Sequence, residues 1–202
     1  MPSTGTAVFG YGSLIWKGPP FDLESKPGFI EGFVMRFAQK SHDHRGTPEN
    51  PGRVATLVTE ADWAKHRTDD PESSLPVWGR IYYISPEQHD DVWAYLDHRE
   101  KDGYSLKTVD VYGVNDKNEK VVVEKDVRVY VAETDNPSFA GGEKMADLGS
   151  RIAKASGPSG PNKDYVYNLC EAVQKLDPHV EDAYLNELER QVRRNDPDSE
   201  SS

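Results

Sequence analysis

The sequence predicts an α+β fold, and the distribution of strand-like and helix-like segments supports this assignment. Segments with the alternating pattern of strands dominate the first two-thirds of the chain, and segments with helical spacing dominate the last third. Such segregation is typical of α+β proteins, whereas doubly wound folds alternate strand and helix regularly. Short strands in this number can also curl into a barrel, although the pattern alone does not establish closure.

The strand-like segments alternate apolar and polar residues, which places one set of side chains on each face of a strand. They are residues 6–11, 28–38, 53–59, 77–84, 105–112 and 121–132. The second is the clearest because its large apolar residues share one parity. These residues are Phe29, Phe33, Met35 and Phe37. Glu31 interrupts the row, so we expect the strand to bend near Gly32 or to begin with an exposed stretch.

The first predicted helix covers residues 85–99. Ser85 and Gln88 have the spacing of a capping box, and Pro86 occupies the first helical position. Gly103 follows shortly after the last helical residue and indicates a stop.

The next two helices are indicated by apolar residues at intervals of three and four. One covers residues 143–155, and the other starts after Asn162, which can serve as its N-cap. Their apolar residues are Met145, Leu148 and Ile152 in one, and Leu169, Val173 and Leu176 in the other.

The last predicted helix begins with Asp177 as its N-cap and Pro178 at the first helical position. Acidic residues in its first turns and three arginines at its end match the helix dipole. Those arginines are Arg190, Arg193 and Arg194. Residues 1–194 are expected to form one domain, and residues 195–202 a disordered acidic tail. Residues 67–76 are polar, contain two prolines, and indicate a surface loop.

Composition excludes several classes of protein. The net charge is −11 and no stretch is rich in Lys and Arg, so we expect no nucleic-acid partner. No apolar run is long enough to cross a bilayer, and the first residues lack the features of a secretory signal. Cys170 is the only cysteine, which rules out an internal disulfide and favours a reducing, cytoplasmic location.

A glycine-punctuated loop follows the first strand at residues 10–16 (GYGSLIW). Successive N–H groups in such a turn can point at an anion. The loop is neither a phosphate-binding P-loop nor a dinucleotide fingerprint, because the following residues do not match either pattern. An ordinary tight turn after a strand explains the same glycines.

Glu100 is the candidate acid/base. Its spacing from Val92, Trp93 and Leu96 places it on the apolar face of the predicted helix. Burial and the negative end of the helix dipole both raise a carboxyl pKa, which suits proton transfer near neutral pH. A glutamate paired with Arg99 or Lys101 at a helix end is the alternative.

Residues 41–53 (SHDHRGTPENPGR) form a polar loop with two histidines. No further ligands occur at a recognisable spacing, so we expect a loop organised by hydrogen bonds and no metal. Arg45 and Arg53 can either hold this loop or meet a carboxylate, because the guanidinium fork suits both tasks.

Residues 157–169 (GPSGPNKDYVYNL) place a stiff turn before a helix. Tyr165 falls in the first helical turn, where its hydroxyl can reach a site or the ring can simply pack. Cys170 lies among apolar residues of the same helix, which favours a buried structural thiol over a nucleophile.

Four segments in this order resemble the ChaC-type, glutathione-specific γ-glutamylcyclotransferases. They are GYGSLIW, SHDHRG with PGR, YLDHREKDGY and GPSGPNKDYVYNL. Each motif is weak alone, but their order is specific, and the resemblance covers residues 7–190. The broader superfamily shares only a shorter Tyr-Gly-Ser turn and a catalytic glutamate. The continuation Leu14 to Trp16 and the DHRG segment resemble the ChaC branch in particular.

The resemblance implies a small mixed β-barrel with flanking helices. It also implies Glu100 as the catalytic residue and a substrate site built from several others. Those substrate-binding residues are Tyr11, Gly12, Ser13, Leu14, Arg53, Tyr104 and Tyr165. Residues 60–75 are longer than the usual connection in the family, which can alter a rim or a partner surface.

The implied activity is that of a lyase that cleaves glutathione to 5-oxoproline and Cys-Gly, with no cofactor and no metal. The substrate's own α-amine is the nucleophile, and Glu100 acts as general acid and base. Two alternatives stay open: a cyclotransferase for other γ-glutamyl amino acids or amines, and a catalytically silent binding module. We expect glutathione as a small-molecule partner, no nucleic-acid or membrane partner, and a monomer or weak homodimer.

Overall fold

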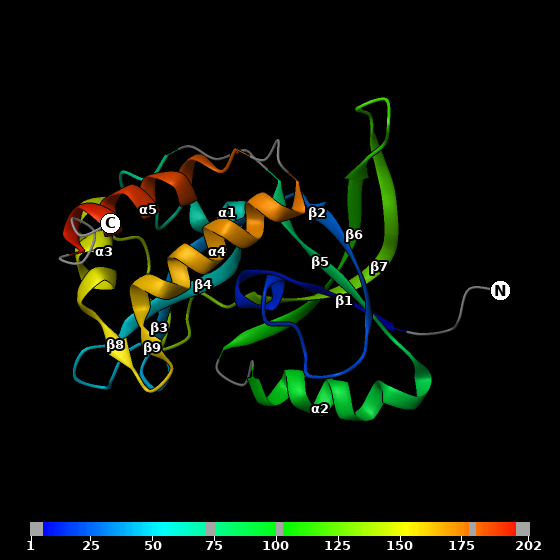
Figure 1. Ribbon diagram of the computed structural model, residues 1–202, viewed down its shortest axis with the longest axis horizontal. Helices are drawn as coiled ribbons and strands as arrows, with labels where there is room; N and C mark the ends of the chain where they lie inside the picture. Colours follow the sequence, from blue (N-terminus) through cyan, green and yellow to red (C-terminus); the bar gives the residue numbers. More distant parts are fainter. Residues whose placement is uncertain (1–5, 72–75, 100–102, 178–180, 197–202) are drawn as a thin grey trace.

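The computed structural model describes residues 6–71, 76–99, 103–177 and 181–196. Five strands close a barrel in the order β1-β5-β2-β6-β7 (Figure 1), which confirms the predicted α+β barrel. The barrel strands are β1 (Thr6–Gly10), β2 (Glu24–Ile30), β5 (Val77–Ile84), β6 (Tyr104–Val114) and β7 (Lys120–Ala132). All neighbouring pairs are antiparallel except β1 and β7, which run parallel where Val8 meets Arg128.

The predicted strand at residues 28–38 is in fact two strands. Phe29 lies on barrel strand β2, whereas Met35 and Phe37 lie on β3 (Phe33–Ser41). The chain turns between them at Gly32, whose φ of 82° is strained for other residues. Strand β3 pairs with β4 (Gly52–Thr59) as a separate two-stranded sheet.

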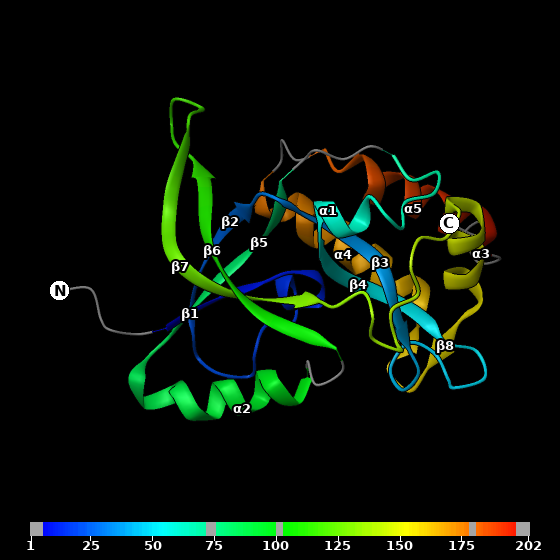
Figure 2. The same cartoon turned by 180° about the vertical axis from the view of Figure 1, so that it is seen from behind.

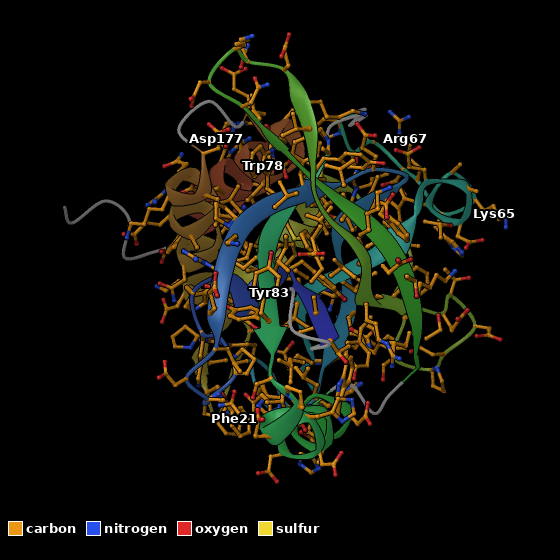
Figure 3. The ribbon with its side chains drawn as sticks, turned by 90° about the vertical axis from the view of Figure 1, so that its right-hand side faces the viewer. Phe21, Lys65, Arg67, Trp78, Tyr83 and Asp177 are labelled. Atoms are coloured by element: carbon orange, nitrogen blue, oxygen red, sulfur yellow. The ribbon has the colours of Figure 1, made fainter. Side chains whose placement is uncertain are left out.

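One helix covers the barrel on one side. Helix α2 (His89–Arg99) follows a 3-10 turn, η2 (Pro86–Gln88), at the position predicted for the first helix. The Ser85 hydroxyl donates to Gln88 Oε1 at 3.3 Å, so the two residues of the predicted capping box bond to each other instead of to backbone N–H groups. Phe21 lies beside this helix (Figure 3), and its ring centroid is 6.0 Å from that of Tyr95.

Three further helices pack together on the other side of the molecule (Figure 2). They are α3 (Met145–Lys154), α4 (Asn162–Leu176) and α5 (Ala183–Asn195). The prediction for α3 is confirmed, and its apolar residues are buried. The short strands β8 (Ser156–Gly157) and β9 (Gly160–Pro161) form the turn between α3 and α4.

Two predicted helix starts are wrong. Helix α4 has Pro161 at its N-cap and Asn162 as its first residue, and the Asn162 side chain bonds to Arg53 on β4 instead of capping the helix. Helix α5 begins at Ala183 and not near Asp177, which ends α4. The carboxylate of Asp182 caps α5 by accepting the N–H of Leu185 at 3.0 Å. Pro178 lies outside the described residues.

The end of the chain is folded further than predicted. Asn195 is the last residue of α5, and Asp196 is buried. Asp196 forms an ion pair with Lys163 at 2.7 Å and accepts the hydroxyl of Tyr167 at 3.0 Å. These two residues therefore belong to the fold, and residues 197–202 lie outside the described residues.

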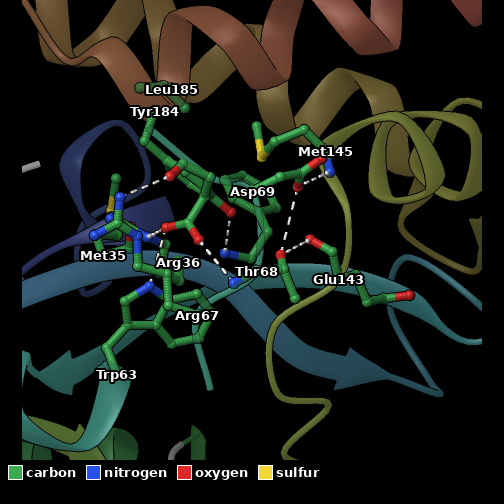
Figure 4. Close-up of polar contacts among 12 residues, drawn as sticks. Met35, Arg36, Trp63, Arg67, Thr68, Asp69, Glu143, Met145, Tyr184 and Leu185 are labelled. Carbon is green, nitrogen blue, oxygen red and sulfur yellow. Dashed lines mark hydrogen bonds and ion pairs between the residues drawn. The ribbon is translucent and has the colours of Figure 1, made fainter. Parts of the chain in front are cut away.

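Residues 60–71 are tied to the core by the buried side chains of Trp63 and Asp70, whereas residues 67–69 are exposed, as the predicted surface loop requires. Helix α1 (Glu60–Trp63) starts the segment. Asp70 is buried and its Oδ2 accepts Arg36 Nε and Trp63 Nε1, each at 3.0 Å. Asp69 Oδ1 accepts the N–H of Met145 at 2.9 Å and thereby caps α3 (Figure 4).

Buried apolar side chains form two large clusters that meet at the barrel. The main cluster joins the barrel and the β3–β4 sheet to α3, α4 and α5, and the second joins the barrel to α2. Among the described residues, no helix combines the length and apolar character required to cross a bilayer.

Candidate active site

The loop after β1 folds into a short 3-10 turn, η1 (Gly12–Ile15). Gly12 has a φ of 55°, in the left-handed region, and a Cβ there would lie 3.0 Å from Tyr165 Oη and 3.3 Å from Ala55 Cβ. Both the backbone conformation and the available space therefore favour glycine. Gly12 therefore serves a tight turn, which is one of the two interpretations that the sequence allowed.

Two N–H groups of the turn have partners within the protein. The N–H of Leu14 donates to the carbonyl of Tyr11 at 3.2 Å. The N–H of Ser13 donates to the hydroxyl of Tyr165, also at 3.2 Å. Because these two N–H groups already have partners, the turn cannot present all of its N–H donors to an anion. The hydrogen bond between Ser13 and Tyr165 is the contact that joins the turn to α4.

Tyr165 comes from α4 and is held on two sides by aromatic rings. Its ring makes edge-to-face contacts with Trp16, at 5.2 Å between centroids, and with Phe37, at 5.6 Å. The residue is buried, and its hydroxyl reaches the turn. The structure thus brings together two segments that are far apart in sequence, as the motifs predicted.

The turn also joins the two apolar clusters. Tyr11 belongs to the main cluster together with Tyr165, and Leu14 belongs to the second cluster together with Leu96 of α2. The carbonyl of Leu14 accepts the hydroxyl of Tyr82 at 2.5 Å. The position of the turn is therefore set by α4 on one side and by the barrel and α2 on the other.

The face of α2 that was predicted to be apolar is buried. Val92 and Leu96 are fully buried and Trp93 is nearly so. Tyr104, at the start of β6, is half-buried and packs against the same cluster. Glu100, the predicted acid/base, lies outside the described residues, so its role stays a prediction.

Arg53 has a carboxylate partner inside the fold. Its Nε donates to Glu143 Oε2 at 2.5 Å, and Glu143 also bonds to Arg151 at 2.9 Å. Because the Arg53 guanidinium is already paired with a carboxylate of the protein, we do not include Arg53 in the proposed site.

Asn162 fixes the first turn of α4, and sequence reasoning missed this role. Its Oδ1 accepts the N–H of Arg53 at 2.7 Å, and its Nδ2 donates to the carbonyl of Arg53 at 2.8 Å. The amide acts as a strand partner for β4 and holds the helix that carries Tyr165. An asparagine after a proline is equally typical of a helix cap, so the sequence held no signal for this bond.

Arg45 is a charged residue that lies near Tyr165. Its guanidinium carbon lies 5.9 Å from the centroid of the Tyr165 ring, and its Nη1 donates to the carbonyl of Pro161 at 2.9 Å. The loop around it is organised by hydrogen bonds, as predicted: the Arg45 N–H donates to Ser41 Oγ at 3.0 Å.

Two other candidates from the sequence were a metal site and a nucleophilic cysteine. Among the described residues, no group of three or more His, Cys, Asp or Glu side chains gathers at a common point. Cys170 is buried, and burial raises the pKa of its thiol above the usual range, which confirms the predicted structural thiol.

Comparisons with known proteins agree on one family. A family model described as ChaC-like protein matches residues 6–195. A glutathione-specific γ-glutamylcyclotransferase of Schizosaccharomyces pombe is 36% identical over 96% of this chain and 95% of its own length. γ-Glutamylcyclotransferase 2-3 of Arabidopsis thaliana is 41% identical over 92% of this chain and 87% of its own length. A crystal structure of the yeast γ-glutamylcyclotransferase specific to glutathione superposes with a TM-score of 0.81 at 33% identity, covering 96% of this chain and 97% of that one.

Proposed function

This chain belongs to the ChaC family, and from that premise we propose that it cleaves glutathione to 5-oxoproline and Cys-Gly as a γ-glutamylcyclotransferase. The observation that carries the proposal is the contact between the Ser13 N–H and the Tyr165 hydroxyl. It places two of the motifs that mark the family at one point in the fold.

The reaction needs no nucleophile from the protein. The α-amine of the glutamyl residue attacks its own γ-carbonyl carbon and forms a C–N bond. The bond from that carbon to the cysteine nitrogen then breaks, and Cys-Gly leaves as the amine. Holding the two reacting groups in the attacking geometry can supply roughly 7–11 kcal/mol in favourable intramolecular reactions.

One proton must leave the attacking nitrogen, and one must reach the departing nitrogen. We assign both transfers to Glu100, which can accept the first proton and return it in the second step. A single carboxyl group is sufficient because the reaction consumes and releases one proton.

The Ser13–Tyr165 pair is proposed to bind the γ-glutamyl group. The pair joins the turn after β1 to α4, and we propose that an oxygen of the substrate binds at this junction. That oxygen is either the developing oxyanion or the α-carboxylate. The half-buried Tyr104 and the buried Leu14 would bound the site on the side of α2.

The decisive experiment is turnover by the purified protein. Incubation with glutathione should yield equal amounts of 5-oxoproline and Cys-Gly, measured by mass spectrometry. Glu100→Gln should lower the rate by several orders of magnitude while the circular dichroism spectrum and melting temperature stay unchanged. Near-normal turnover by this variant would remove Glu100 from the mechanism.

Substrate preference is tested in the same assay. Glutathione should be consumed much faster than γ-glutamyl-alanine at equal concentration. A preference for γ-glutamyl-alanine would make the chain a cyclotransferase for other γ-glutamyl compounds. Binding of both compounds without turnover would identify a silent binding module.

We also propose that the protein acts in the cytoplasm as a monomer or weak homodimer. A single cysteine that is buried suits a reducing compartment. Cell fractionation and sedimentation velocity over a range of concentrations would test these two points.

A further inference from the structure

The loop between β3 and β4 holds Arg45 in one place. The Arg45 N–H donates to Ser41 Oγ at 3.0 Å, and its Nη1 donates to the carbonyl of Pro161 at 2.9 Å. The first bond fixes the backbone of the residue, and the second fixes the guanidinium. Both bonds leave the guanidinium beside the first residues of α4.

The surrounding backbone is equally constrained. The N–H of Ser159 donates to the carbonyl of His44 at 2.9 Å. Gly157 packs so closely against this loop that a Cβ would lie 2.5 Å from the N–H nitrogen of Gly46. The loop and the turn before α4 therefore form one unit, and a ligand would meet an arginine that is already in position.

The guanidinium lies near Tyr165, a residue of the proposed site. Its carbon lies 5.9 Å from the centroid of the Tyr165 ring, and the Tyr165 hydroxyl accepts the N–H of Ser13 in the turn. The two peptide residues that follow the γ-glutamyl group span roughly 7 Å when extended. A glutathione whose γ-carbonyl lies at the Ser13–Tyr165 pair can therefore place its far end at Arg45.

Arg45 differs in its partners from two buried arginines, Arg36 and Arg53. Arg36 is paired with Asp70, and Arg53 is paired with Glu143. Within the described part of the chain, the side chain of Arg45 contacts a backbone carbonyl and an aromatic ring, and no carboxylate. A guanidinium has five N–H donors, and its planar fork matches a carboxylate.

We propose that Arg45 binds the glycyl carboxylate of glutathione and so selects the tripeptide over γ-glutamyl compounds that lack this group. The proposal rests on the proposed function and adds the residue that reads the far end of the substrate. Arg45 takes no part in bond breaking, so its contribution should appear in binding.

The test compares glutathione with its C-terminal carboxamide, which has the same γ-glutamyl bond but no glycyl charge. Arg45→Met should lower kcat/KM for glutathione about ten- to hundredfold, the range of a lost hydrogen bond to a charged group, and mainly through KM. The same variant should leave kcat/KM for the carboxamide within a factor of about two. Arg45→Lys should recover part of the loss, because it restores the charge without the fork.

Arg194→Gln is the matched control, because Arg194 is exposed on the last turn of α5. It should leave both substrates unaffected. An equal loss on both substrates in Arg45→Met, or no loss on glutathione, would overturn the proposal.

Calorimetric binding of both compounds separates this proposal from the proposed function. If the wild-type protein does not turn over glutathione, the proposed function fails. Tighter binding of glutathione than of its carboxamide, abolished in Arg45→Met, would still support the role of Arg45. Equal binding of the two compounds by the wild-type protein would refute it.

Discussion

Gly12 combines a left-handed backbone with close contact to Tyr165, whose hydroxyl accepts the N–H of Ser13. Gly12→Ala should cost about 1–2 kcal/mol of stability from its backbone alone. It should also displace the Tyr165 hydroxyl from Ser13 and lower kcat/KM at least about tenfold. Urea unfolding and the glutathione assay would measure the two effects separately.

Gly32→Ala is the matched control for this prediction. Gly32 has a φ of 82°, and a Cβ there would have nothing within 4 Å. The control should lose a similar amount of stability and keep its activity. If both variants lose activity equally, the effect of Gly12→Ala is one of folding and not of the site.

At the residue scale, the residues proposed for the site were identified by resemblance to continuous family motifs. Pattern alone left the turn at Tyr11 to Leu14 and the role of Tyr165 open, and the structure adds the bond that joins them. Arg53 and Asn162 were assigned other roles, because their partners lie far along the chain. Which of two arginines in one loop meets a carboxylate depends on packing that no local pattern records.

At the scale of elements, residues 60–71 hold α1, β3 and α3 together through Asp70 and Asp69. Asp70→Ala would leave Arg36 buried without its carboxylate, and should cost about 3–5 kcal/mol of unfolding free energy. Urea denaturation followed by circular dichroism measures this loss. The double variant Arg36→Met with Asp70→Leu should recover much of it, because neither charge then remains.

The exposed pair of Asp62 and Lys65 on the same segment provides the comparison. The hydrogen bond from Lys65 holds the pKa of Asp62 below its usual value, yet the pair is solvated. Asp62→Ala should therefore cost no more than about 1 kcal/mol. A loss as large as that of Asp70→Ala would show that burial is not what distinguishes the two carboxylates.

The predicted element boundaries were wrong where a turn left the alternation of apolar and polar residues unchanged. The two-residue turn at Glu31 and Gly32 keeps Phe29 and Phe33 at even spacing, so the alternation continues across two different strands. The start of α5 was misplaced because Asp177 followed by Pro178 has the composition of a helix start, whereas Asp182 provides the cap. Composition shows that a residue can cap a helix, but tertiary contacts decide which one does.

At the scale of the whole molecule, the fold class was predictable and barrel closure was not. The order of strands and helices along the chain identifies α+β, because each element has its own periodicity. Closure depends on the parallel contact between β1 and β7 at Val8 and Arg128. That contact joins the two ends of the strand-rich region, and hydrophobic periodicity carries no information about it.

The burial of Cys170 bears on the redox environment in which such an enzyme would work. Thiols that are exposed and ionised exchange with oxidised glutathione and become blocked by it. The chain has one cysteine, and its sulfur lies in the apolar core with a raised pKa. Incubation with glutathione disulfide should leave the intact mass of the folded protein unchanged, whereas a mass increase of one glutathionyl group would contradict this. Activity should accordingly be insensitive to mixed-disulfide formation, even when oxidative stress depletes the reduced substrate.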